Sequence, residues 1–177
     1  LYADVFHKTY GIDCIGLRYF NVFGRKQDPD GAYAAVIPKF VMQFMKHEAP
    51  VINGDGTFSR DFTYIDDIVE GIVRIQNVVP LRNAENSNTS PASSKAPYKV
   101  FNIGNNEPIA LMTFIEAIEK AANKEASKNY MPMQAGDVPA TFADIDSLKA
   151  EVGFKPDTNI EFGMQQFVDW FKEYYKK

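Results

Sequence analysis

The fold is decided by residues 16–38, which read GLRYFNVFGRKQDPDGAYAAVIP. Aromatic, β-branched and other apolar side chains lead into this stretch, so we expect a buried β-strand over residues 14–20. The apolar pattern stops at Asn21, and a long loop rich in glycine and proline follows. The loop leads into a helix with Pro38 in its first turn, where the N–H that proline lacks has no intrahelical partner.

A ligand site is expected where this strand ends. In an open α/β sheet, ligands bind outside the carboxyl ends of the strands, so Asn21 and the loop after it are the candidate site. On residue types alone, a surface loop without function between a strand and a packed helix fits equally well.

Composition and charge narrow the function classes. The chain has 177 residues, 45% of them hydrophobic and 24% charged, which is typical of one globular domain. Its net charge of −4 argues against nucleic-acid binding, and no apolar run approaches the ~20 residues of a membrane span. The single cysteine, Cys14, has no partner for an internal disulfide, so we expect it buried and inert in a reducing, cytoplasmic compartment.

Apolar periodicity predicts further elements along the chain. Helices are expected over residues 36–47, 65–75, 111–122, 146–153 and 160–171, and strands over residues 51–53, 62–64, 99–104 and 130–133. Asp146 is the expected N-cap of its helix, which Gly153 ends. Residues 80–97 contain almost no large apolar side chain, so we expect a flexible loop there.

Neither histidine is expected to bind a metal ion. His7 and His47 belong to different predicted helices, and neither has a carboxylate or cysteine partner at a metal-ligand spacing. Both are expected at the surface, and no metal site is predicted.

Several short motifs follow one another along the chain: RYFNVFG (18–24), QDP (27–29), GAYAAVIP (31–38), GDG (54–56), SRDFTYID (59–66) and GDV (136–138). Together they resemble the substrate-side signature of the extended short-chain dehydrogenase/reductase family. The resemblance is strongest to its UDP-sugar 4-epimerases of the UDP-N-acetylglucosamine type, which serve bacterial surface polysaccharides. Each motif alone is weak, but their order and spacing match the family over nearly the whole chain.

The resemblance implies an α/β fold: the carboxyl-terminal, substrate-binding part of a Rossmann-type structure, with the last parallel strands and a small α/β substrate domain. Residues 1–177 would form a single such domain. The family's Gly-x-Gly-x-x-Gly fingerprint and Tyr-x-x-x-Lys catalytic pair are missing, and residues 1–8 read as the end of an amphipathic helix. We therefore expect that this chain lacks the NAD-binding amino-terminal half.

Arg60 and Asn21 are the candidate polar residues of the site. The guanidinium of Arg60 can bind a phosphate through two N–H groups, and the resemblance assigns it to the diphosphate of a nucleotide sugar. As a plain surface residue it would pair with Asp55 or Asp61. The amide of Asn21 can donate and accept hydrogen bonds, and in the family this position contacts the substrate. Its alternative role is an Asx-turn that caps the strand.

Small and apolar residues are expected around the base. Ala35 and Val36 open a helix, whose free N–H groups can bind a uracil carbonyl. The resemblance places Phe40 and Val51 beside the base, although Phe40 fits the helix core equally well.

Residues on either side of Asn21 are the candidate contacts to the cofactor. The resemblance brings Tyr19 and Val22 near the nicotinamide of NAD. Thr63 and Tyr64 are expected in the core instead.

Gln134 and Asp137 complete the predicted substrate site. Gln134 lies where similar N-acetylglucosamine epimerases carry arginine, so residues 132–139 look like the corresponding run of UDP-glucuronate 4-epimerases. Asp28 argues against a uronate substrate, because the uronate enzymes have arginine at this position and a carboxylate would repel the carboxylate of a uronate. Asn21, where the uronate enzymes have threonine, also departs from them. Asn21 and Asp28 therefore favour UDP-N-acetylglucosamine despite the uronate-like run at Gln134, and UDP-glucuronate is the alternative.

The resemblance implies an NAD-dependent isomerase that moves a hydride from C4 of a UDP-sugar to NAD and returns it to the other face of the sugar. The full-length enzyme is expected to be a homodimer, and the present chain alone is expected to be inactive. A non-catalytic nucleotide-sugar-binding module is the alternative of another class. A 4,6-dehydratase or reductase of the same family is a further alternative.

Overall fold

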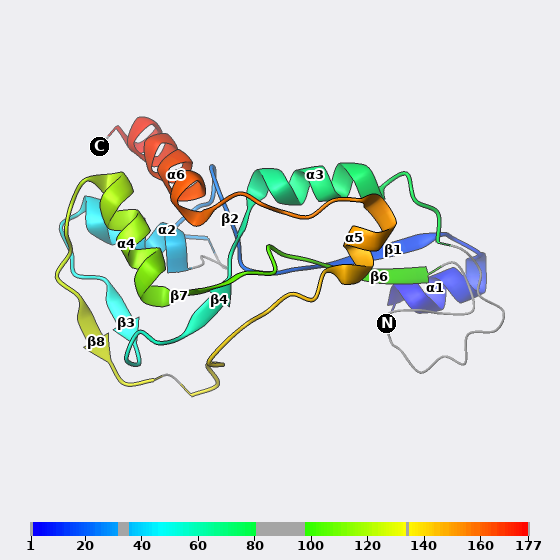
Figure 1. The fold of residues 1–177 in the computed structure, drawn as a ribbon, viewed down its shortest axis with the longest axis horizontal. Coiled ribbons are helices and arrows are strands. Elements are labelled where there is room, and N and C mark those ends of the chain that lie inside the picture. Colours follow the sequence, from blue (N-terminus) through cyan, green and yellow to red (C-terminus); the bar gives the residue numbers. More distant parts are fainter. Residues whose placement is uncertain (1, 32–35, 81–97, 134, 177) are drawn as a thin grey trace.

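Two parallel strands and three helices form one end of the molecule, which we call the strand lobe (Figure 1). The computed structural model describes residues 2–31, 36–80, 98–133 and 135–176. Strand β1 pairs with β6 in register from Cys14 opposite Tyr98 to Tyr19 opposite Ile103. The elements of the strand lobe are α1 (Tyr2–Tyr10), β1 (Cys14–Tyr19), α3 (Ile65–Ile75), β6 (Tyr98–Ile103) and α5 (Asp146–Val152).

Helices and short strands form the other end, which we call the pocket lobe (Figure 1). Its elements are α2 (Val36–Met45), β3 (Val51–Asn53), β4 (Ser59–Asp61), β7 (Pro108–Ala110), α4 (Leu111–Ala122), β8 (Asn129–Met131) and α6 (Ile160–Tyr175). Strands β3 and β8 pair in parallel, and β4 and β7 pair antiparallel. Between the lobes, β2 (Val22–Phe23) pairs in parallel with β5 (Thr63–Tyr64).

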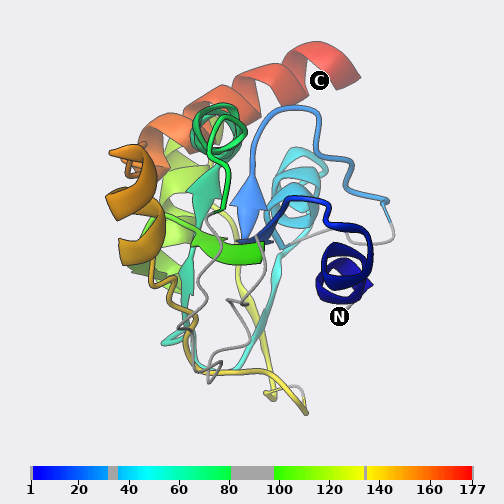
Figure 2. The same cartoon turned by 90° about the vertical axis from the view of Figure 1, so that its right-hand side faces the viewer.

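The pocket lobe packs around the larger of two apolar clusters. Helix α4 packs against both α6 and α2, and Figure 2 shows α6 running across the top of the molecule. The rings of Phe62 and Phe114 stack in this cluster with centroids 4.6 Å apart. The apolar stripe expected on the last helix is buried as predicted, at Ile160, Met164, Phe167, Val168 and Phe171. This core holds α2 and β4 in place, and both elements wall the cavity described below.

The strand lobe has a smaller core. Helix α3 approaches β6 closely at Gly71, because a Cβ there would lie only 2.4 Å from Cδ1 of Ile103. The buried residues of this core are Ile68, Ile75, Phe101, Ile103 and Leu148.

The mixed α/β fold and most of the predicted elements are confirmed. Thr63 and Tyr64 are buried as expected. Helix α5 ends at Gly153, whose φ of 62° is left-handed, as predicted for this glycine. The expected flexible loop at 80–97 lies outside the described residues, apart from Pro80.

The prediction that β1 is a buried strand is wrong. Its first four residues are half-buried, Cys14 among them, and Arg18 and Tyr19 are exposed. Within the part of the chain that the structure describes, β1 has a neighbouring strand on one edge only. Packing therefore covers its side chains incompletely.

His7 also differs from expectation. It is 1% exposed rather than at the surface, because its face of α1 packs towards the ring of Tyr98. Its Nδ1 lies 2.6 Å from the carbonyl oxygen of Ile12, just past the end of the helix. His47 is exposed, as predicted.

Asp146 is not the N-cap of α5, contrary to prediction. Ile145 occupies the cap position, so Asp146 is the first helical residue. The carboxylate that meets the start of the helix belongs to Asp144, which accepts a hydrogen bond from the N–H of Asp146 at 3.1 Å.

A membrane-spanning helix and a metal-binding cluster are both absent from the described residues. No helix there is long and apolar enough to cross a membrane. The same residues contain no group of three or more His, Cys, Asp or Glu side chains placed to hold a metal ion.

Candidate functional site

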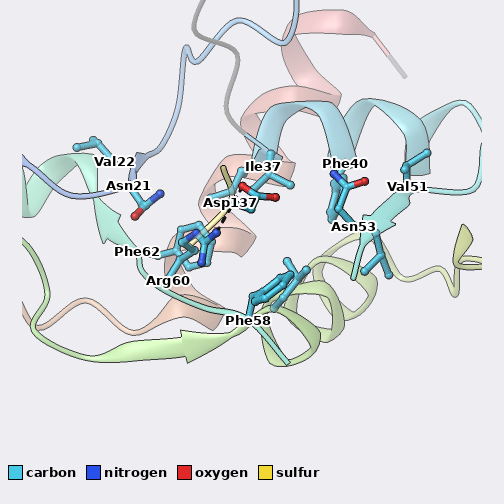
Figure 3. A pocket seen from close by; sticks show the side chains of 13 residues that line it. Asn21, Val22, Ile37, Phe40, Val51, Asn53, Phe58, Arg60, Phe62 and Asp137 are labelled. Carbon is cyan, nitrogen blue, oxygen red and sulfur yellow. Dashed lines mark ion pairs between the residues drawn. The ribbon is translucent and has the colours of Figure 1, made fainter. Parts of the chain in front are cut away.

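A cavity of about 310 Å³ lies between α2, β3, β4 and the chain that follows β1 (Figure 3). Most of the residues predicted for the site line it: Asn21, Val22, Val36, Phe40, Val51, Arg60 and Asp137. Segments that are distant in the sequence therefore meet at one place.

Three residues predicted for the site are not among the described residues that line the cavity. Tyr19 does not line the cavity, and its side chain is 54% exposed at the end of β1. Ala35 and Gln134 lie outside the described residues.

Arg60 enters the cavity from β4, where it lies opposite Ile109 of β7. Its Nη1 donates to the carbonyl oxygen of Ser59 at 2.8 Å and to that of Pro139 at 3.5 Å. Its Nη2 lies 3.9 Å from Oδ1 of Asp137, an ion pair drawn in Figure 3. This distance is too long for a hydrogen bond, so Nη2 can donate to an anion that enters the cavity.

Asp61, the sequence neighbour of Arg60, does not pair with it. Successive residues of a strand point to opposite faces, and Asp61 is 0% exposed on the inner face of β4. Its carboxylate accepts hydrogen bonds from the backbone N–H groups of Asn105, Asn106 and Ala143. The side chain of Asp61 is therefore buried in the protein interior, whereas that of Arg60 faces the cavity.

Asp55, the other carboxylate considered for Arg60, is engaged within its own turn. It accepts hydrogen bonds from the hydroxyl of Thr57 at 2.6 Å and from the N–H of Thr57 at 3.0 Å. These bonds hold the pKa of Asp55 below its ordinary value. The pairing of Arg60 with Asp55 or Asp61 is thus replaced by a long ion pair with Asp137.

Asn21 is held by a contact far away in the sequence, not by an Asx-turn. Its Oδ1 accepts a hydrogen bond from the hydroxyl of Thr141 at 3.1 Å. The same hydroxyl oxygen accepts from the N–H of Asp61, so its proton is free to be donated to Asn21. The backbone of Asn21 is left-handed, with φ of 34°, a region that asparagine tolerates. With its oxygen engaged, the NH₂ group of Asn21 is left as the donor.

Figure 3 shows the order of the side chains along the cavity, in which Asn53 lies near Phe40 and Val22 lies near Asn21. Phe40 and Val51 lie at one end, Arg60 and Asp137 lie in the middle, and Asn21 lies at the other end. Phe40 lines the cavity and is also part of the apolar core; its place beside a base stays a prediction. An elongated ligand with a flat apolar part, an anionic middle and a polar end would match this order.

Several lining residues were missed by the sequence analysis. Phe58 has a usable sequence signal, because it is an aromatic residue directly after the polar turn at 54–57. In the structure its ring centroid lies 5.9 Å from the guanidinium carbon of Arg60. Asn53 is the last residue of a predicted strand and could have been included on a ground similar to that for Asn21, as a polar residue at a strand end. The remaining missed residues are Ile37, Ile52, Phe62 and Leu111.

Asp28 does not line the cavity, so the sequence argument that it selects the sugar loses its support. Its Oδ1 accepts a hydrogen bond from the N–H of Asp30 at 2.9 Å, within its own loop. A carboxylate engaged in this turn does not face the ligand space.

The cavity offers binding groups rather than an acid–base pair. Among the described lining residues, Arg60 and Asp137 are the titratable side chains. A guanidinium with one nitrogen free to donate favours a phosphate, and the surrounding apolar walls favour an aromatic base.

The chain belongs to the NAD dependent epimerase/dehydratase family, whose model matches residues 1–104. Some of its relatives carry the names of UDP-glucuronate 4-epimerases. Over 180 residues it is 42% identical to the "Probable UDP-glucuronate 4-epimerase" of Rhizobium meliloti (strain 1021), covering 100% of this chain and 52% of that protein. Over 179 residues it is 45% identical to Protein CapI of Staphylococcus aureus, with the same coverage of 100% and 52%.

A solved structure agrees with these matches. The UDP-N-acetylglucosamine 4-epimerase of Methanobrevibacter ruminantium M1, in complex with UDP-N-acetylmuramic acid, superposes with a TM-score of 0.78 at 34% identity. The match covers 98% of this chain and 50% of that chain. The fold is therefore that of the Rossmann-type epimerases, and the chain spans about half the length of the relatives that it matches.

Proposed function

We propose that this chain is the substrate-binding part of an NAD-dependent UDP-sugar 4-epimerase. The observation that carries the proposal is the cavity itself, in which Arg60 lies between an apolar end at Phe40 and Val51 and an amide end at Asn21. This order matches the uracil, diphosphate and hexose of a UDP-sugar. Family membership supplies the reaction class.

The residues of the cavity would bind and orient the nucleotide. Arg60 donates from Nη2 to the diphosphate, a charge-assisted contact that fixes the ligand along the cavity. Val36, Phe40 and Val51 cover the base, and Val36, the first residue of α2, would offer its N–H to a uracil carbonyl. Asn21 donates to a sugar hydroxyl or a phosphate oxygen. Holding the diphosphate while the hexose turns is what a 4-epimerase requires of this part.

The residues at the end of β1 are the proposed contacts to NAD. Tyr19 presents an exposed ring there, and Val22 begins the next strand at the rim of the cavity. The cofactor supplies hydride transfer at C4 when it is bound. The chain's own task is to present the sugar beside these two residues.

The catalytic groups are proposed to lie outside these 177 residues, which contain no Tyr-x-x-x-Lys pair. We therefore expect that the isolated chain turns over no UDP-sugar, whereas the natural protein that contains it acts as a cytoplasmic, homodimeric epimerase. The measurement is epimerisation of UDP-N-acetylglucosamine by each protein. Turnover by the isolated chain would contradict the proposed division of labour. UDP binding without turnover by the natural protein would favour the non-catalytic module.

The sugar is proposed to be UDP-N-acetylglucosamine or its C4 epimer, as a precursor of surface polysaccharide. Arg60 is the cation among the described lining residues, and the diphosphate occupies it. The carboxylate of a hexuronate would need a second cation, because a buried charge without a partner is costly. A neutral N-acetylhexosamine has no such requirement.

UDP-glucuronate is the second candidate, because a relative 42% identical to this chain bears the name of a UDP-glucuronate 4-epimerase. The two sugars are separated by kcat/KM of the natural protein, measured with both at equal concentration. We expect the larger value for UDP-N-acetylglucosamine. A larger value for the uronate would show that residues beyond the described wall select the sugar.

A further inference from the structure

Asp61 is buried directly behind Arg60, and no cation pairs with it among the described residues. We propose that Asp61 is a positioning residue of the nucleotide-sugar site: it acts through Arg60 and Asn21 and does not touch the ligand. The inference rests on the proposed function, because it concerns the affinity of the same cavity.

The carboxylate of Asp61 joins three separate segments of the chain. Its Oδ1 accepts from the N–H of Asn105 at 3.0 Å, and its Oδ2 accepts from those of Asn106 at 3.1 Å and Ala143 at 2.8 Å. Hydrogen bonds to an ionised acceptor are stronger than neutral ones. Strand β4, the turn after β6 and the segment before α5 are thus held at one point.

The packing around this point is close at Gly104. A Cβ on Gly104 would lie 2.4 Å from Cβ of Ala143 and 3.3 Å from Oδ2 of Asp61. Glycine at this position therefore lets the segment at Ala143 reach the carboxylate. The site is built for this contact.

Residue 61 is also connected to Asn21 and Arg60, the two polar residues that we propose contact the ligand. The N–H of Asp61 donates to the hydroxyl of Thr141, which in turn donates to Oδ1 of Asn21, with both distances 3.1 Å. This fixes the amide of Asn21 with its NH₂ group as the donor. This link starts from the backbone N–H of residue 61, so the carboxylate acts on Asn21 indirectly, by holding β4 against the segment at Ala143, two residues after Thr141.

Arg60 is connected through the backbone on its other side. The N–H of Ser59 donates to the carbonyl oxygen of Pro139 at 3.0 Å, and the N–H of Thr141 donates to that of Ser59 at 3.2 Å. The segment that carries Asp137 therefore runs along β4, beside the guanidinium. If Asp61 released Ala143, this segment would shift relative to Arg60.

Asp67 provides a matched control for a purely structural role. It is also a buried carboxylate, 9% exposed, and its Oδ2 accepts from the N–H of Thr158 at 3.1 Å. It belongs to α3 and does not line the cavity. Loss of this bond should affect stability without affecting the ligand site.

The test compares Asp61→Asn with Asp67→Asn in the 177-residue chain, by calorimetric titration with UDP at a temperature where both are folded. The amide presents an N–H donor to backbone donors, so we expect Asp61→Asn to weaken UDP binding about tenfold. Asp67→Asn should leave the affinity unchanged. In an Arg60→Ala background, the further loss from Asp61→Asn should be smaller, because the two residues act through one contact.

The outcomes separate the two proposals. If the unaltered chain binds no UDP, the proposed function is overturned and this inference with it. If the unaltered chain binds UDP and Asp61→Asn binds equally tightly, the inference alone is overturned. Equal losses in Asp61→Asn and Asp67→Asn would also overturn it, because they would show a general effect on folding.

A measurement on the unaltered chain decides the matter if Asp61→Asn does not fold. We expect UDP to slow amide hydrogen exchange at Asn105, Asn106 and Ala143 by a larger factor than at Thr158, which Asp67 binds. The same factor at all four amides would indicate global stabilisation by the ligand and would overturn the positioning role. In the natural protein, a positioning role predicts that Asp61→Asn raises KM more than it lowers kcat.

Discussion

The two lobes differ in how well their own residues bury their apolar side chains. The pocket lobe surrounds a large cluster to which all three of its helices contribute. The strand lobe buries a handful of side chains and leaves much of α1 and its surroundings exposed. Its exposed apolar residues include Tyr2, Val5, Phe6, Tyr10, Ile12 and Tyr19.

This difference shows which part of the chain can hold a binding site rigidly. Arg60, Phe40 and Val51 are carried by elements that pack on the larger cluster, so their positions depend on contacts within the pocket lobe. Tyr19, at the end of β1, has no comparable support. We expect substrate affinity and stability to be properties of the pocket lobe.

The largest expected effect compares two phenylalanines. Phe167→Ala, at a residue 0% exposed on α6, should lower the free energy of unfolding by about 3–5 kcal/mol, because it leaves a cavity in the larger core. Phe6→Ala, at a residue 49% exposed on α1, should lower it by less than about 1 kcal/mol. The measurement is urea unfolding followed by the fluorescence of Trp170, the single tryptophan, which packs on Phe167. Equal losses would remove the distinction between the lobes.

The next effect concerns binding. Arg60→Ala should weaken UDP binding by about 1.5–3 kcal/mol, the range for a hydrogen bond to a charged group. Its effect on the free energy of unfolding should stay below about 1 kcal/mol. Arg74→Ala is the matched control, because Arg74 pairs with Glu70 on α3 in the strand lobe, outside the cavity. Calorimetric titration should find its UDP affinity unchanged; a loss equal to that of Arg60→Ala would contradict the assignment.

The smallest effect compares two carboxylates as the pH falls. Partial burial acts to raise the pKa of Glu119, but hydrogen bonds from Lys128 and from the N–H of Ala126, with the charge of Lys128, outweigh it and lower the pKa. Its ionised form therefore stabilises the folded chain above the ordinary value of 4.5, and this contribution is lost as pH falls through the lowered pKa.

Glu119→Gln should therefore cost about 1–2 kcal/mol at pH 7 and progressively less at acid pH. Glu151, whose pair with Lys99 in the strand lobe is more exposed, should cost under about 1 kcal/mol when changed to Gln. Urea unfolding at several pH values measures both. A Glu119→Gln loss that is the same at every pH would contradict the role given to its ionised form.

Regular periodicity made the helices predictable from the sequence. The stripe on α6 recurs at helical spacing, and its buried residues could be read directly. The position of the site was predictable for a related reason, since Asn21 marks where an apolar strand pattern stops and ligands bind at strand ends. Both inferences use information that lies close together in the chain.

Long-range contacts account for what the sequence did not reveal. The partner of Asn21 is Thr141, 120 residues away, so a local Asx-turn was the nearest guess. The burial of His7 depends on a neighbour in β6. The pairing of Arg60 with Asp61 overlooked that adjacent strand residues point to opposite faces, a rule that the sequence already offered. Asp55 is engaged by Thr57 within its own turn instead.

A crystal structure of this chain with UDP tests the central claim most directly. The account predicts that the diphosphate lies within hydrogen-bond distance of the Arg60 guanidinium, with the uracil at the end of the cavity formed by Phe40 and Val51. UDP bound away from Arg60, or an empty cavity at saturating UDP, would contradict it.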